Sequence, residues 1–102
     1  MKKIINGKKY DTETAKELGS AYSSYGKRDF SYWEETLYIK RTGEYFLYGW
    51  GGPASRYSEP VGHNGRESGE RITPFTEQEA KEWAEKYLDV DEYEAIFGEV
   101  EE

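Results

Sequence analysis

The chain has no cysteine among its 102 residues, and it has only one histidine, one methionine and three prolines. Without cysteine there is no disulfide framework, no thiolate nucleophile and no thiolate metal site, which fits a reducing cytoplasm. No stretch approaches the roughly 18 consecutive apolar residues of a membrane span, and residues 1–7 contain no apolar signal-peptide core. The sequence therefore predicts neither export by a signal peptide nor a place in the membrane.

Residues for catalysis are equally scarce. The single histidine, His63, lies in a glycine-rich stretch and has no second His or Cys with which to hold a metal or share a proton. Several glycines occur between Gly49 and Gly69, but no Gly-Lys-Ser or Gly-Lys-Thr follows them to form a phosphate loop. The paired carboxylates Glu34 and Glu35 have the pattern of solvated side chains. We expect no enzyme, no metal and no cofactor.

Aromatic side chains are plentiful, because ten Tyr, four Phe and three Trp make up 17% of the chain. They indicate a small core built largely from rings, although 34% of the residues are charged. The length is that of one ordinary domain. We expect residues 1–98 to form a single domain, with 99–102 as an acidic tail.

The first third of the chain has mixed signals. Residues 2–11 read as a short hairpin around the turn dipeptide Asn6-Gly7. Asp11 or Thr12 has the side chain of a helix N-cap, and Gly19 is a typical helix stop, so the pattern predicts a short N-terminal helix through Leu18. Residues 20–32 have no clean period and are interpreted as a loop or an irregular aromatic extension.

Residues 33–41 and 44–50 give the strongest strand signal, because they are rich in Tyr, Trp, Phe, Ile and Leu. With Thr42-Gly43 as a two-residue loop, Ile39 lies opposite Phe46 and Leu37 lies opposite Tyr48. A third strand is expected over residues 70–73. The glycine-rich stretch 51–69 between them is predicted to be a surface loop.

The C-terminal region predicts two helices. Thr76 and Glu79 form a capping box, and apolar residues recur after it with helical spacing at Ala80, Trp83, Ala84, Tyr87 and Leu88. Asp89 or Asp91 can cap a second short helix that Gly98 ends. Together the patterns predict an α+β fold, in which an antiparallel sheet centred on the 33–50 hairpin carries an amphipathic helix on one face.

Charge is distributed very unevenly along the chain. Residues 76–102 contain eleven acidic residues and two lysines, a net charge of −9, which leaves +2 for the rest of the chain. Acids on the solvent side of a helix are normal, but this row continues well past one helix. We interpret it as a surface for a basic partner, made by Glu82, Glu85, Asp89, Asp91, Glu92 and Glu94. Loop contacts are expected from Arg56 and Tyr57, and Tyr48 and Trp50 are further candidate rings.

A nucleic-acid-binding role is the alternative. The first 42 residues carry nine basic and six acidic residues, and nearby tyrosines could stack on bases. The cations concerned are Lys2, Lys3, Lys8, Lys9, Lys27 and Arg28. Such a protein would bind oligonucleotides in a salt-sensitive way, whereas a binder of basic proteins would not. A third possibility is an enzyme that inactivates its target, and such an enzyme would inhibit at substoichiometric amounts.

The segments Tyr10 to Ala15, Leu37 to Gly49, Ile72 to Trp83 and Tyr93 to Gly98 carry a resemblance that spans most of the chain. The sequence resembles small proteins carried by phages and mobile elements of Gram-positive bacteria, some of them associated with anti-CRISPR loci. The resemblance implies a non-enzymatic inhibitor in the bacterial host cytoplasm that blocks the nucleic-acid-binding surface of a CRISPR-Cas effector subunit. Because the acidic C-terminal region would repel phosphate, we expect no direct nucleic-acid contact, and the oligomeric state stays open.

Overall fold

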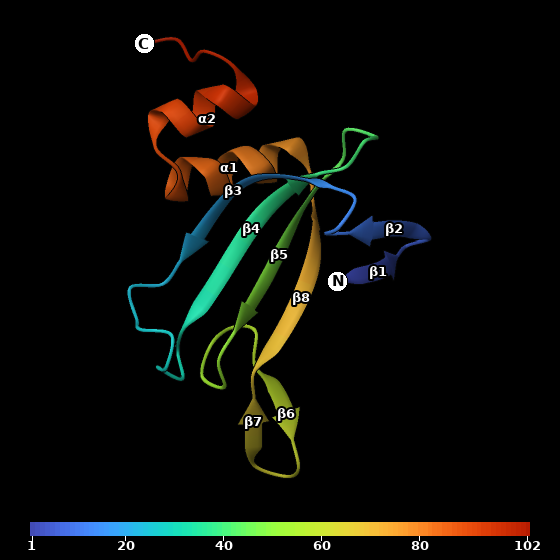
Figure 1. Ribbon diagram of the computed structural model, residues 1–102, viewed down its shortest axis with the longest axis vertical. Coiled ribbons are helices and arrows are strands. Elements are labelled where there is room, and N and C mark those ends of the chain that lie inside the picture. Colours follow the sequence, from blue (N-terminus) through green and yellow to red (C-terminus); the bar gives the residue numbers. More distant parts are fainter.

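A four-stranded antiparallel sheet in the order β3-β4-β5-β8 forms the centre of the computed structural model, which describes residues 1–102 (Figure 1). Helix α1 (Glu77–Tyr87) packs across one face of this sheet, and α2 (Val90–Phe97) packs on α1. Two small hairpins project from the sheet, one formed by β1 (Lys2–Ile5) and β2 (Lys8–Asp11) and the other by β6 (Glu59–Val61) and β7 (Gly65–Glu67). This arrangement confirms the α+β class predicted from the sequence. The sheet strands are β3 (Lys16–Tyr22), β4 (Trp33–Ile39), β5 (Tyr45–Gly51) and β8 (Gly69–Phe75).

The N-terminal hairpin follows the prediction. Strands β1 (Lys2–Ile5) and β2 (Lys8–Asp11) pair in antiparallel register across Asn6 and Gly7. Both turn residues have positive φ, 51° and 78°, which is the conformation of the tight two-residue turn that this dipeptide favours.

The predicted N-terminal helix is wrong. Residues from Lys16 onward form β3, a seven-residue strand that pairs with β4 through six of its residues, with a register shift between Glu17 and Gly19. Asp11 does bond a nearby amide, since its Oδ1 accepts from the Glu13 N–H at 2.9 Å, but it closes a turn and caps no helix. The hydrogen bonds and side-chain packing available at the sheet edge outweigh this weak local helix signal. The strand also occupies residues 20–22 of the predicted loop.

The central hairpin is present, but its predicted register is shifted by one residue. Leu37 lies opposite Leu47, and Ile39 lies opposite Tyr45. The Lys40 N–H donates to the Glu44 carbonyl at 2.8 Å, so three residues, 41–43, form the loop, with Gly43 at φ 90°. A three-residue loop with glycine in the left-handed region is a common hairpin connection. Because strand side chains alternate, the shift moves Leu47 and Tyr45 to the same face as Leu37.

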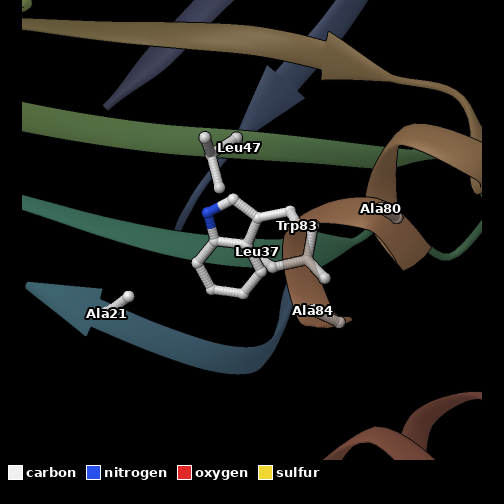
Figure 2. Packing of buried hydrophobic residues seen from close by; sticks show 6 residues of the cluster. All are labelled: Ala21, Leu37, Leu47, Ala80, Trp83 and Ala84. Atoms are coloured by element: carbon white, nitrogen blue, oxygen red, sulfur yellow. The ribbon is translucent and has the colours of Figure 1, made fainter. Parts of the chain in front are cut away.

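Two clusters of side chains cover the two faces of the sheet. On the helix face, Trp83 extends from α1 onto the sheet and lies beside Leu37 and Leu47, with three alanines around it (Figure 2). On the opposite face, Tyr10 from β2 meets Phe46 edge-on, and Ile72 completes the cluster. The N-terminal hairpin therefore covers part of the face that the helices leave open.

Both C-terminal helices begin and end near the predicted residues. Helix α1 (Glu77–Tyr87) starts at the Thr76–Glu79 capping box, which is confirmed with both of its reciprocal hydrogen bonds. Helix α2 (Val90–Phe97) has Asp89 as its N-cap and Gly98 as its C-cap. Neither helix has the length and apolar content needed to cross a bilayer.

The glycine-rich stretch 51–69 is more ordered than predicted. It contains the hairpin β6 (Glu59–Val61) with β7 (Gly65–Glu67), which extends from the end of the sheet farthest from α2 (Figure 1). The segment before it turns back over the helix face and buries Tyr57. The prediction of a third sheet strand at residues 70–73 is confirmed by β8.

Candidate functional site

A groove of about 420 Å³ opens between α1 and the segment 52–58 on the helix face of the sheet. It contains three of the residues predicted to contact a partner, Arg56, Tyr57 and Glu82. Two further cations, Arg71 and Lys86, line the same groove. Its floor is the carboxylate of Glu35, which lies on β4 and points toward the helix.

Glu35 is 2% exposed, so the interpretation of this residue as a solvated carboxylate is wrong. Its Oε1 accepts a hydrogen bond from the Trp83 indole N–H at 3.0 Å, and its Oε2 accepts one from the Tyr57 hydroxyl. The Arg56 guanidinium lies 3.4 Å from the same Oε2. Every buried side-chain polar atom in the chain has a partner, and this carboxylate has three. The network fastens β4, α1 and the 52–58 segment together.

Arg56 and Tyr57 have different places in this network. The Arg56 side chain is 50% exposed, and its guanidinium carbon lies 4.7 Å from the centre of the Trp33 ring. Tyr57 is only 4% exposed, so it lines the inner wall of the groove and offers little free surface to a partner. Burial and the hydrogen bond to Glu35 raise the pKa of the Tyr57 hydroxyl far above its usual value.

Gly49 makes room for Tyr57. A Cβ at Gly49 would lie 2.0 Å from Cζ of the tyrosine ring, closer than any side-chain atom can approach. Gly49 is therefore required by the packing of Tyr57 and does not form a turn. It lies in the middle of β5, where the missing side chain lets the ring pack onto the backbone.

The other two candidate rings lie on the opposite face of the sheet from the helices. Tyr48 packs against the cluster of Tyr10 and Phe46, and its hydroxyl donates to Glu70 at 2.7 Å. Trp50 follows on the same face, with its indole N–H donating to Glu34 at 2.9 Å. These rings do not adjoin the acidic helices.

The six predicted acidic residues fall into three places. Glu82 lines the groove described above. Glu85, Asp89 and Glu94 surround a second hollow of about 360 Å³ at the junction of α1 and α2, which we call the helix cleft. Its remaining lining is apolar: Leu88, Val90, Tyr93 and Val100. Asp91 and Glu92 lie in the first turn of α2 and line neither hollow.

Three of these acids, Asp89, Glu92 and Glu94, also stabilise the local backbone. Of these roles, the sequence predicted only a helix cap at Asp89 or Asp91. Asp89 accepts from the Glu92 N–H at 2.8 Å, and the Glu92 carboxylate accepts from the Asp89 N–H at 3.3 Å. This second capping box begins α2. The Glu94 carboxylate accepts from the Val100 N–H at 2.9 Å, which folds the end of the chain back toward α2.

Almost none of the C-terminal carboxylates has a cation partner in the chain. Of the five ion pairs, one involves this region, between Glu77 and Lys81 at 3.6 Å. The other ten acidic residues after Thr76 make no ion pair. Their charge is therefore uncompensated within the chain.

Comparison with known proteins finds no matching family model, no matching curated protein and no matching solved structure. No group of three or more His, Asp or Glu side chains has an arrangement that could hold a metal ion. His63 is exposed in the turn between β6 and β7.

The cations proposed for nucleic-acid contact do not converge on one surface. Lys2, Lys3, Lys8 and Lys9 lie on the β1-β2 hairpin, whereas residues 27 and 28 lie in the distant loop between β3 and β4 (Figure 1). Lys8 pairs with Glu44 at 2.7 Å, and Lys27 lies 3.9 Å from Glu34. Lys9 alone among the six lines a hollow in the surface.

Sequence reasoning missed Glu35 and the polar function of Trp83. A signal for Glu35 was present, because Trp33, Glu35 and Leu37 alternate along β4 and therefore share one face. Because Trp33 and Leu37 are apolar, the pattern predicts that this face is buried. The Glu35 carboxylate between them therefore requires hydrogen-bond donors that are also buried. No local pattern indicates which donors supply them, since they come from residues 57 and 83.

Proposed function

We propose that this protein is a non-enzymatic inhibitor that binds a basic, nucleic-acid-binding surface of a CRISPR-Cas effector subunit and blocks access of DNA or RNA. The acidic C-terminal helices form the binding surface. The observation that carries the proposal is the ten unpaired carboxylates after Thr76, three of which surround the helix cleft.

The helix cleft has the chemistry of a receptor for lysine or arginine side chains. Its apolar wall suits the alkyl stem of such a side chain, and the carboxylates of Glu85, Asp89 and Glu94 suit the charged head. Val90 and Val100 are 71% and 59% exposed, so both are open to a partner. Apolar contact supplies the affinity that exposed charges alone do not, because exposed ion pairs contribute at most about 1 kcal/mol each.

A row of unpaired carboxylates also raises the rate of encounter with a basic groove, and this effect weakens with salt. Grooves that hold DNA or RNA backbones are lined with Lys and Arg. The acidic surface therefore competes for the same cations as the nucleic acid. The resemblance to proteins associated with anti-CRISPR loci supports a CRISPR effector as the protein that contains this basic groove.

The test uses a panel of purified, guide-loaded CRISPR effectors and measures target binding by mobility shift as the protein is added. We expect at least one effector to lose target binding near one inhibitor per effector. Inhibition at far smaller ratios would instead indicate an enzyme. If no effector in the panel is inhibited, the proposal fails.

The choice of variant matters because Asp89 caps α2, so reversing its charge would disturb the helix as well as the surface. We therefore combine Glu85→Lys with Asp89→Asn, which keeps a capping side chain. The matched control combines Glu59→Lys with Glu67→Gln on the exposed β6-β7 hairpin, which changes the net charge equally. The cleft variant should lose inhibition and the control should keep it. Equal inhibition by both variants would contradict a role for the cleft.

A further inference from the structure

Two adjoining hollows beside the N-terminal hairpin have a cationic lining, although the chain as a whole is acidic. They have volumes of about 240 and 400 Å³ and share Thr14, Ala15, Lys40 and Arg41 as lining residues. The first hollow is also lined by Lys9 and Asp11, and the second by Lys16 and Ile39. We call the two hollows together the basic pocket. It lies between the turn after β2 and the turn between β4 and β5.

Four cations line the basic pocket, against a single acid. Asp11 is that acid, and it is 4% exposed with its Oδ1 accepting from the Glu13 N–H within its own turn. The lining therefore has a net charge of +3 on a chain whose total is −7. Such a reversal of sign concentrates anions at one place on the surface.

The cations of the pocket are largely free. Lys9, Lys16 and Arg41 make no ion pair within the chain. Thr14, which lines both hollows, makes no hydrogen bond through its amide or its hydroxyl. Unpaired ammonium, guanidinium, amide and hydroxyl donors are the groups that bind an oxyanion.

Lys40 is held in a fixed position at the centre of this group. Its side chain is 13% exposed, its Nζ donates to the Lys9 carbonyl at 3.0 Å, and it lies 4.0 Å from the centre of the Tyr10 ring. Glu44, 3.3 Å away on its other side, neutralises part of its charge but does not line the pocket. The position of Lys40 is thus set before any ligand arrives, which reduces the entropy lost on binding.

We propose that the basic pocket binds a phosphate group. A phosphate has more oxygens and more charge than a carboxylate, and it can engage several of these donors at once. Two sources share this chemistry, the backbone of a nucleic acid and a free phosphate or nucleotide. The pocket shares no residue with the helix cleft, so this proposal stands independently of the proposed inhibitor function.

The test is an NMR titration of the full chain with inorganic phosphate in one arm and a short single-stranded oligonucleotide in the other, at matched ionic strength. We expect saturable shifts of the Thr14, Ala15 and Arg41 amides. Tighter binding in the oligonucleotide arm, weakening steeply with salt, assigns the site to a nucleic-acid backbone. Saturation by phosphate alone assigns it to a free phosphate. Either result supports the pocket.

The test variant is Lys9→Gln with Arg41→Gln, and the matched control is Lys3→Gln with Arg28→Gln, exposed cations that do not line the pocket. The test variant should bind about tenfold or more weakly, because a tenfold loss needs only about 1.4 kcal/mol and two charge-assisted contacts are removed. The control should bind as the parent does. The proposal is overturned if neither arm saturates up to roughly 10 mM phosphate, or if both variants bind equally.

Discussion

Glu35 shows how one side chain connects three distant parts of the chain. A buried carboxylate is costly unless donors surround it, and here the donors come from α1 and from the 52–58 segment. The residue therefore makes the position of that segment depend on the helix. The groove above it keeps its shape because its floor is a satisfied network rather than loosely packed side chains.

Replacement of Glu35 by alanine should be strongly destabilising. It leaves the Trp83 indole N–H and the Tyr57 hydroxyl buried without an acceptor, and each lost partner costs about 1–3 kcal/mol. Arg56 is half exposed and regains water, so it adds little. We expect urea unfolding to show a total loss of roughly 2–5 kcal/mol.

Tyr57→Phe is the matched control for this prediction, because it keeps the ring beside Gly49 and removes one hydrogen bond. Its cost should be about 1–3 kcal/mol, smaller than that of Glu35→Ala. An alanine variant that loses less stability than the phenylalanine variant would show that the network is not what holds the segment.

The elements differ in how well the sequence predicts them, and the reason is the distance over which each signal acts. The Thr76–Glu79 capping box, the aspartate cap of the second helix, the Asn6-Gly7 hairpin and the helix stripe depend on residues within a few positions of one another, and all are confirmed. The expected N-terminal helix failed because β3 is stabilised by pairing with β4, some twenty residues away. Local capping signals contain no information about that pairing.

The central hairpin gives a finer example. Its strands were predictable from composition, but its register depends on whether the loop has two residues or three. Gly43 fits either loop, and the pairing of Lys40 with Glu44 selects three. The candidate site was limited in the same way: the acidic residues were visible as a charge run, whereas the cleft, the groove and the basic pocket each combine segments distant in sequence.

The capping role of Asp89 predicts a local effect on α2. Asp89→Ala removes the side-chain acceptor for the Glu92 N–H and should weaken the helix by about 0.5–2 kcal/mol, whereas Asp89→Asn should leave it nearly unchanged. Amide hydrogen exchange along α2 is the appropriate measurement, because this short helix can open while the sheet remains folded. Faster exchange in both variants would mean that the charge, and not the cap, holds the helix.

Different elements form the acidic and the basic surfaces of the molecule: α1 and α2 form the helix cleft, and the turns beside the N-terminal hairpin form the basic pocket. In Figure 1, α2 and the C-terminus lie at one end of the 50 Å long axis, and the β6-β7 hairpin lies at the other. The basic pocket lies beside the N-terminal hairpin. At physiological salt, charges are screened beyond roughly 8 Å, so distant surfaces of opposite sign act independently. A phosphate at the pocket and a basic protein surface at the helix cleft are therefore compatible.

The many carboxylates of α1 and α2 that lack an ion-pair partner also lower the stability of the free protein. Eleven carboxylates with two lysines repel one another, and only one of the five ion pairs lies in this region. Salt screens the repulsion more than it weakens the few surface pairs, so Tm should rise by a few degrees between low and physiological ionic strength. Thermal unfolding followed by circular dichroism measures the change in Tm.

Variants of the acidic residues test the cause of the salt dependence. Glu85→Gln with Asp91→Asn should reduce the salt dependence of Tm, whereas Glu59→Gln with Glu67→Gln should reduce it less. A Tm that falls with salt would show that attractive pairs, not repulsion, dominate the folded state.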